Sequence, residues 1–519
     1  MTSNAFEPSA SAWKGSFRVS PEMAGAFLTG IALVVALNFR HAPFNNEFLY
    51  LIYPYRWSHP SYIATDWTLA APEREHLIFN LIAGTLLRFI PPITLLWIGR
   101  LVCWMLLISA WLRATGRLGI RPVLAILALA IWQGAGQSLF GGEWLFQTFE
   151  SKVVAYVFVL FALDQLFLGN DRRAGGLLGI AFSLHPAVGL SCALASGVGY
   201  LFLGRDRRRL IRFAAAGIAG ALPGAVVALP LLLQSAGPGG DMWQVMVHAV
   251  LPMHLDPASW PRGSMALAAL MLAFNILQVR QDAPAAEWRF LLAFECALAG
   301  ITTFGFIVYA TGHYSLLAIY PFRVFPLLIT PCFLLHFFRA FRNGQLAPSH
   351  PVLSLCALIT IFKLPDHSLY SIPWIVADRI SEWSAPEADA DRAYAWIREH
   401  TPADAVVASP PWLKESFYLS ERAQVGSLLA VVNDRLPEWR ARNEILIGPL
   451  SAYVTRDRSA MQRHFDHLAV EDIATMRRRY GATLLLTRGS YALPRLHREG
   501  EYSVYDLGPA SVKPEAVRR

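Results

Sequence analysis

The chain has 519 residues, of which 55% are apolar and only 16% are charged. Soluble domains usually carry roughly 25% charged residues, so this composition excludes an ordinary soluble protein and favours a polytopic membrane protein. The 45 Lys and Arg exceed the 37 Asp and Glu, which gives a net charge of +8. The positive residues fall mainly in short loops between apolar segments, so we expect contact with lipid head groups and no nucleic-acid partner.

About eleven apolar segments along the chain have the character of membrane crossings. The first follows Lys14 and Arg18 without a convincing cleavage site, which predicts an uncleaved helix and not a signal peptide. The amphipathic stretch 76–89 ends at Pro91-Pro92 and is expected to lie on the membrane surface. The predicted crossings are 23–39, 92–112, 122–138, 152–168, 174–185, 187–203, 212–233, 264–279, 290–310, 324–338 and 350–364.

Alternate loops of this arrangement concentrate the basic residues, for example in 113–121, 172–173, 205–212 and 339–342. Because Lys and Arg are retained on the cytoplasmic side, the N-terminus is predicted to be cytoplasmic, in a bacterial inner (cytoplasmic) membrane. The stretch 175–204 has arginines at both ends and would break the alternation as one crossing. We therefore divide it at His185-Pro186 into two short helices.

Residues 371–519 have a mixed-charge composition and predict a separate α/β domain. The expected fold is thus mainly α-helical, with a transmembrane bundle over 1–370 and a periplasmic, or extracytoplasmic, C-terminal α/β domain. Within this domain we predict helices over 390–400 and 470–480, and strands over 404–409, 482–487 and 502–505.

Two long polar loops, 40–75 and 137–152, carry four carboxylates that are predicted on the outer face: Glu47, Asp66, Glu143 and Glu150. A carboxylate near apolar walls can act as a general base, and oxygen ligands suit Mg²⁺ or Mn²⁺. The alternative for each is solvation or an ion pair, such as Glu150 with Lys152. The sequence leaves the metal unknown.

Several further residues are candidates for substrate binding: Lys152, His185, Arg323, Trp67 and Trp144. A guanidinium such as that of Arg323 binds phosphate in a bidentate manner, although it could equally extend toward the lipid head groups. His185 could donate to a phosphate, or it could cap a helix. The tryptophans suit a sugar face, and equally the anchoring belt of any membrane protein.

The five cysteines, Cys103, Cys192, Cys296, Cys332 and Cys356, all lie in apolar runs without paired spacing, so we interpret them as buried small side chains. There is no glycine-rich phosphate loop, HExxH or GxSxG motif. Nucleotide-driven transport and zinc proteolysis are therefore unsupported.

The arrangement resembles the GT-C superfamily of polytopic membrane glycosyltransferases. The resemblance rests on a first helix followed by a long acidic outer loop, a surface helix, about eleven crossings and an outer α/β domain. Locally, Gly142-Glu143, Glu150-Ser-Lys152, Ser183-Leu-His185-Pro186 and the tail motifs at 396–402 and 409–411 are similar to a poorly characterised bacterial family near these enzymes.

The resemblance implies a cell-envelope transferase that moves a hexosyl or pentosyl group, with inversion, from polyprenyl phosphate to a lipid, glycan or protein acceptor. It places the catalytic acid at Glu47 or Asp66, with Glu143 and Glu150 as acids of the second loop. Lys152 and Arg323 would stabilise the departing phosphate. Adjacent acidic pairs, common in GT-C loops, are missing here, which leaves metal dependence open.

Two other classes of function stay open at this point. One is a non-catalytic membrane protein that binds, moves or presents a lipid-linked substrate. The other is an ion-coupled transporter, which predicts inverted repeats and a polar midplane site that the sequence does not show.

Overall fold

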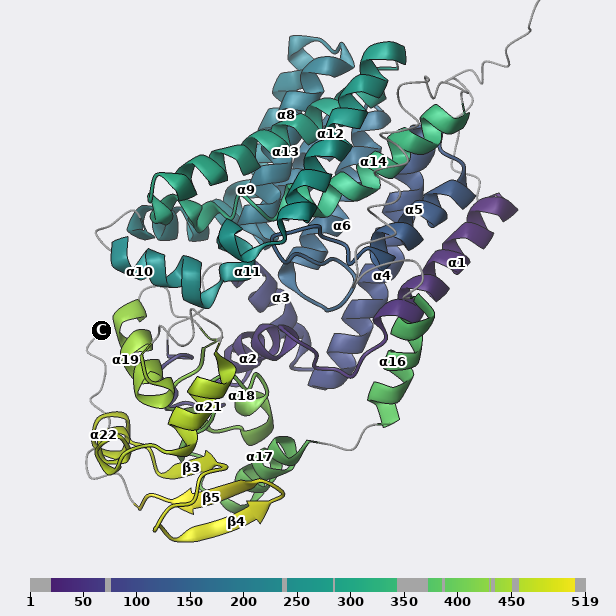
Figure 1. Ribbon diagram of the computed structural model, residues 1–519. Helices are drawn as coiled ribbons and strands as arrows, with labels where there is room; N and C mark the ends of the chain where they lie inside the picture. Colours follow the sequence, from purple (N-terminus) through teal and green to yellow (C-terminus); the bar gives the residue numbers. More distant parts are fainter. Residues whose placement is uncertain are drawn as a thin grey trace, which may run out of the picture.

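The computed structural model shows a helical bundle joined to a small α/β domain, which lies at the lower end of the molecule in Figure 1. The structure describes residues 20–70, 76–235, 240–282, 285–342, 372–384, 388–428, 430, 435–449 and 457–508. The chain is mainly α-helical, as predicted.

The bundle contains helices of very different length. In chain order they are α1 (Pro21–Asn38), α2 (Glu47–Ser58), α3 (Leu77–Leu86), α4 (Pro92–Arg117), α5 (Pro122–Gly134), α6 (Ser151–Phe167), α7 (Asp171–Leu184), α8 (Pro186–Tyr200), α9 (Arg207–Ser235), α10 (Gly240–Val245), α11 (Pro252–Leu255), α12 (Arg262–Asp282), α13 (Ala286–Ala310) and α14 (Val324–Arg342). Short turns of other helix types are η2 (Leu201–Leu203), η3 (Met246–Val250), η4 (Pro257–Ser259) and η5 (Tyr314–Ile319).

Proline begins several of these helices, because its missing N–H would be unpaired in the first turn anyway. Pro21, Pro92, Pro122 and Pro186 occupy this position in α1, α4, α5 and α8. The prolines therefore fix where the apolar segments start.

Seven helical segments in the described part are long and apolar enough to cross a membrane. They are α1, α4, α8 with η2, the first part of α9, α12, α13 and α14. The chain is thus a multi-pass membrane protein. Every predicted crossing up to 324–338 corresponds to a helix, but α5, α6 and α7 have only 13, 17 and 14 residues. The crossing predicted over 350–364 lies outside the described residues, and so does Cys356. Cys103, Cys192 and Cys332 are buried as predicted, but that prediction is wrong for Cys296, which is exposed on α13.

The predicted division at His185-Pro186 is confirmed, because α7 ends at Leu184 and α8 begins at Pro186. The His185 side chain caps α8, accepting a hydrogen bond from the Val188 N–H at 3.3 Å. The cap satisfies one of the donors that a helix start leaves unpaired.

Arginines from α4 and α9 lie close to the α6–α7 turn at one end of the bundle. Asp164 pairs with Arg113 at 2.8 Å and with Arg117 at 3.2 Å, and Asp171 pairs with Arg209 at 2.6 Å. The chain segments that follow α4, α6 and α8 therefore share one end, as the alternation of basic loops predicts. Which side of the membrane this end faces stays a prediction.

The C-terminal part is an α/β domain, as predicted. After α16 (Ile372–Ser384) come α17 (Asp389–His400), β1 (Val406–Ala408), α18 (Ser416–Ser420), β2 (Ala423–Gln424), α19 (Leu436–Ile447), α21 (Arg458–Asp466), α22 (Val470–Tyr480), β3 (Leu484–Thr487), β4 (Arg495–Glu499) and β5 (Tyr502–Asp506). The sheet has the order β2-β1-β3-β5-β4, in which β1 is parallel to β2 and β3, and β5 is antiparallel to β3 and β4.

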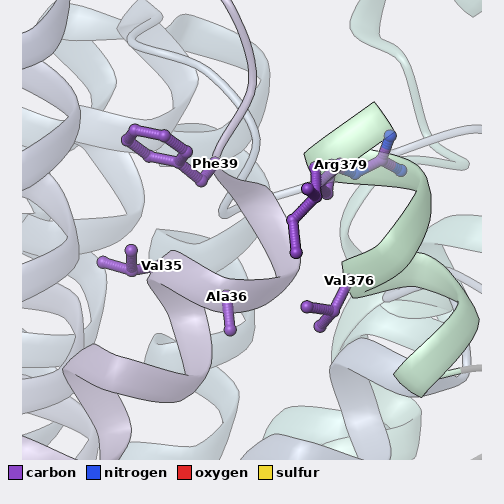
Figure 2. Close-up of a pocket in the computed structure, with 6 residues that line it drawn as sticks. Val35, Ala36, Phe39, Val376 and Arg379 are labelled. Carbon is purple, nitrogen blue, oxygen red and sulfur yellow. The ribbon is translucent and has the colours of Figure 1, made fainter. Parts of the chain in front are cut away.

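Helix α16 precedes this fold and packs against α1 of the bundle, on the right of Figure 1. A cavity of about 300 Å³ lies between the two helices and is lined by Val35, Ala36, Phe39, Val376, Arg379 and Ile380 (Figure 2). The predicted domain boundary near residue 371 falls at the start of this helix and stays a prediction.

The two parts of the molecule share an apolar cluster. Ile63 and Trp67 of the loop after α2 and Met246 of η3 are buried together with Phe417 and Trp439 of the α/β domain. The domain is therefore packed on the bundle through the first long loop and the segment before α11.

Candidate active site

A tight turn places the second polar loop against the segment before α14. Gly141 and Gly142 both have positive φ, 73° and 61°, a conformation that side-chain-bearing residues rarely adopt. A Cβ on Gly141 would lie 2.5 Å from the carbonyl oxygen of Phe322. Glycine at this position therefore lets Glu143 approach Arg323.

Glu143 lies between two cations in the interior. Its Oε1 is 2.6 Å from the Lys152 ammonium and its Oε2 is 3.4 Å from Arg323 Nε. Burial raises the pKa of Glu143, but Lys152, Arg323 and His254 lower it more, so the pKa lies below its usual value. The carboxylate is ionised at neutral pH and holds both cations in place.

Lys152, in the first turn of α6, also contacts the two other predicted residues of its loop. Its ammonium lies 3.5 Å from the centroid of a Trp144 ring and 3.5 Å from Glu150 Oε2. The other oxygen of Glu150 accepts hydrogen bonds from Trp144 Nε1 at 3.2 Å and from the Thr148 hydroxyl. Lys152 thus joins both acids of the loop and a tryptophan face.

Arg323 follows a backbone turn at Tyr320, whose φ of 51° is unusual for a residue with a side chain. Its guanidinium lies 4.2 Å from the Tyr320 ring centroid, and its Nη1 is 3.0 Å from His185 Nε2. The Arg323 side chain keeps 14% of its surface exposed, whereas Glu143 has none. The open side of the cluster is therefore the arginine side.

Two histidines of the cluster are neutral. Burial, then the neighbouring His76, Arg323 and Lys152, lowers the pKa of His185 well below its ordinary value. Burial and Arg323 likewise lower the pKa of His254 to about 3. His254 Nδ1 donates to the Gly141 carbonyl at 2.7 Å, which supports the glycine turn. The positive charge of the cluster therefore comes from Lys152 and Arg323.

Glu47 lies beside this cluster but is fully engaged. Its Oε1 accepts from Arg100 Nε at 2.7 Å and from the Phe149 N–H at 2.7 Å. Its Oε2 accepts from Arg100 Nη2 and from the Phe44 N–H at 2.8 Å. Both side chains of the ion pair are wholly buried. This geometry joins the first and second polar loops to α4, and the predicted catalytic role of Glu47 stays a prediction.

Asp66 and Trp67 lie at the junction with the α/β domain. Asp66 Oδ1 accepts from the N–H groups of Thr68 and Leu69 at 2.8 and 3.0 Å, and Oδ2 accepts from the Gln424 N–H at 2.9 Å. Trp67 packs under Arg442, whose guanidinium carbon is 4.6 Å from its ring centroid. Both residues therefore link the α/β domain to the bundle through these contacts. Their predicted roles in catalysis and binding stay predictions.

The structure thus brings together six of the predicted residues: Glu143, Trp144, Glu150, Lys152, His185 and Arg323. Four further residues in contact with this region were not candidates from the sequence: His76, His254, Tyr320 and Lys414. The His76 ring lies tilted against that of His185 with ring centroids 5.0 Å apart, and Lys414 of the α/β domain donates to Asn45 in the first loop. A search for every polar aromatic or cation in the predicted outer loops would have included His254 and Tyr320, but nothing local to Lys414 indicates this contact.

In the part of the chain that the structure describes, no group of three or more His, Cys, Asp or Glu side chains is placed to hold a metal ion. Each acid of the cluster is instead placed beside the Lys152 ammonium. In this arrangement the carboxylates of Glu143 and Glu150 offset the charges of Lys152 and Arg323.

Comparison with known proteins finds a family of uncharacterised role and distant structural likenesses. Residues 388–446 match the family described as a domain of unknown function, DUF6798. No curated protein matches the sequence. The fold is similar to that of the Archaeoglobus fulgidus oligosaccharyltransferase, solved with zinc and sulfate, at a TM-score of 0.43 and 11% identity over 89% of this chain and 67% of that one. A likeness at this level concerns the arrangement of the chain and carries no information about activity.

Proposed function

We propose that the protein is a membrane glycosyltransferase that moves a sugar from a polyprenyl-phosphate donor to an extracytoplasmic lipid, glycan or protein acceptor. The supporting observation is the convergence of Lys152 and Arg323 on the same buried carboxylate, Glu143. Two cations held close together inside a membrane protein suit a phosphate, whose oxygens both side chains can bind. A buried cation is costly without an anionic partner, so a bound phosphate would be favoured there.

In this proposal Lys152 and Arg323 bind the phosphate of the donor. As the bond between the anomeric carbon and the phosphate oxygen breaks, negative charge grows on the phosphate, and both cations stabilise it. Glu143 keeps the two side chains in position when no donor is bound. Attack of the acceptor from the face opposite the phosphate would invert the anomeric centre.

Trp144 contributes a flat apolar surface next to the two cations. The Lys152 ammonium lies over one face of its ring, 3.5 Å from the ring centroid. Such a surface suits the C–H face of a sugar ring. Glu150 keeps one oxygen, Oε2, that accepts no hydrogen bond within the described residues. This oxygen can therefore accept a hydrogen bond from a sugar or acceptor hydroxyl without losing one that it already makes.

The experiment measures transfer by purified protein from labelled hexosyl- and pentosyl-polyprenyl phosphates to a membrane lipid extract and to glycan and protein acceptors. We expect Lys152→Met and Arg323→Met to reduce transfer by about 100-fold each, as loss of one charge-stabilising group typically does. Arg212→Met, at an exposed arginine of α9, is the matched control and should transfer normally. Absence of transfer by the natural protein, or normal transfer by both site variants, contradicts the proposal.

The second candidate is a non-catalytic protein that binds or presents a lipid-linked substrate. It is favoured by the engagement of Glu47 and Asp66, whose oxygens all accept hydrogen bonds. Saturable donor binding that requires Lys152 and Arg323, without turnover of any acceptor, would favour this function. Asp66→Asn and Glu47→Gln belong in the same assay, because normal transfer by both would remove these residues as the base.

A further inference from the structure

A second polar cluster lies on the segment between α10 and α12 and includes none of the predicted residues. His248 Nδ1 is 3.0 Å from Asp256 Oδ2. Asp256 Oδ1 accepts from the Tyr309 hydroxyl at 2.8 Å and from the Ala258 N–H at 2.9 Å. On the other side of the ring, His248 Nε2 is 3.4 Å from the Tyr314 hydroxyl.

These contacts determine which ring nitrogen is basic. A carboxylate accepts hydrogen bonds, so its position opposite Nδ1 keeps the proton of a neutral imidazole on Nδ1. The lone pair is then on Nε2. Asp256 is held by two other donors and cannot turn away, so it can stabilise the imidazolium that forms when Nε2 takes a proton.

The cluster is accessible, unlike the buried acids of the second polar loop. The His248 side chain is 24% exposed and that of Asp256 is 11% exposed. Tyr309 and Tyr314 stand edge-on to the imidazole, with ring centroids 5.9 and 5.3 Å away. Two hydroxyls and the imidazole Nε2 thus form a polar cluster at the surface, and an acceptor hydroxyl would take the place of the Tyr314 hydroxyl at Nε2.

This second cluster adjoins the cluster of Lys152 and Arg323 through α11. His254, within α11, donates to Gly141 and lies near Trp144 with ring centroids 6.3 Å apart, whereas Asp256 follows two residues later. Two residues span at most about 7 Å between Cα atoms. The connection from α13 to α14 likewise carries both Tyr314 and Arg323. The same two segments therefore supply both clusters.

We propose that His248 is the general base that deprotonates the acceptor hydroxyl, with Asp256 as its positioning residue; this inference rests on the proposed glycosyl transfer. The hydroxyl proton passes to Nε2, and the hydroxyl oxygen forms a bond to the anomeric carbon. The bond between that carbon and the phosphate breaks, and the phosphate leaves with the electron pair to Lys152 and Arg323. The imidazolium then releases its proton to water.

The test combines substitution with chemical rescue in the transfer assay described above. We expect His248→Ala to lower transfer by about 100-fold, within the range usual for loss of a general base. Added imidazole should restore at least a tenth of the activity, because the partly exposed position admits a small free base. His313→Ala, at an exposed histidine of the same outer region, is the control and should neither lose activity nor respond to imidazole.

Asp256→Asn tests the positioning role. We expect a fall in kcat with little change in KM for the donor, and no rescue by imidazole while His248 is present. In His248→Ala with imidazole, the added Asp256→Asn substitution should have a smaller effect than it has alone, because the free base no longer depends on this carboxylate for its position.

The outcomes separate this inference from the function on which it rests. If the natural protein transfers no sugar, the proposed function and the assigned base both fail. If it does transfer, normal activity of His248→Ala overturns the base alone, and so does a loss that imidazole does not restore in well-folded protein. Loss of transfer in Glu150→Gln together with normal activity in His248→Ala would assign the proton to Glu150.

Discussion

Arg100 is a charged residue within an apolar segment, which is costly unless a partner lies at the same depth. Its partner is Glu47, with Arg40 and His41 contributing carbonyl acceptors at 2.7 and 3.1 Å. Burial raises the pKa of Glu47, although Arg100 and two backbone N–H groups oppose this shift. Glu47 is therefore a buried carboxyl paired with Arg100, and its predicted catalytic role stays a prediction. Arg100 lies 53 positions from Glu47 in sequence, inside the predicted crossing 92–112, where no local pattern indicates the contact.

Replacing this arginine tests the ion pair. Arg100→Met leaves the Glu47 carboxylate buried without its cation, which typically costs about 3–5 kcal/mol in the free energy of unfolding. We expect a lower midpoint of thermal unfolding in detergent at pH 7.5. The double variant Glu47→Gln/Arg100→Met should be more stable than Arg100→Met, since no unpaired charge remains.

The pH dependence has a definite sign. A carboxyl whose folded-state pKa is raised binds more protons in the folded than in the unfolded state, so stability falls as pH rises from the unfolded value of 4.5 through the folded one. Without Arg100 this pKa is raised further. The loss in Arg100→Met should thus be smaller at pH 5 than at pH 7.5, and an equal loss at both pH values would contradict this account.

At the scale of elements, α7 and α9 approach each other closely through glycines. A Cβ on Gly179 would lie 2.2 Å from the carbonyl oxygen of Gly217, and one on Gly175 would lie 2.0 Å from that of Phe213. These neighbours are backbone atoms, so the helices would have to separate. Close contact of small residues is a common way of packing helices in membranes.

Gly179→Ala should therefore destabilise the bundle by about 1–3 kcal/mol, the usual cost of overpacking. Gly176→Ala is the matched control on the same helix, because a Cβ there meets no atom within 4 Å. It should be neutral or slightly stabilising, since alanine favours the helix over glycine. Thermal unfolding in detergent compares the two, and an equal effect of both substitutions would show that helix propensity dominates over packing.

The elements predicted from the sequence were those with a strong local pattern. Helices α17 and α22 and strands β1, β3 and β5 fall at the predicted places. Strand β2 has only two residues, and β4 reads Arg-Leu-His-Arg-Glu with mostly exposed side chains, so neither shows the apolar pattern of a buried strand. Both were missed because pairing with a neighbouring strand, and not local sequence, defines them.

At the scale of the whole molecule, hydropathy predicted the helices but not what they bring together. Glu143, His185 and Arg323 come from three separate connections of the bundle and Lys152 from the first turn of α6, and each was a candidate on its own residue type. Their convergence depends on the glycine turn at 141–142 and on how α6, α8 and α14 pack. The association of Asp66 with Gln424 likewise spans 358 positions in sequence. Such contacts are set by tertiary packing, which the sequence of one chain does not display.

Transfer outside the cytoplasm requires that the bundle is oriented with its arginine-rich end in the cytoplasm and the α/β domain outside. Glu399 of α17 is exposed and lies in the α/β domain. Arg208 of α9 is exposed and lies near the arginine-rich end of the bundle. In a cysteine-free background we expect Glu399→Cys to react with a membrane-impermeant maleimide on intact cells. Arg208→Cys should react only after the membrane is permeabilised, because basic loops stay in the cytoplasm. The reverse pattern would place Lys152 and Arg323 at the cytoplasmic surface, where an acceptor outside the cell could not reach the donor.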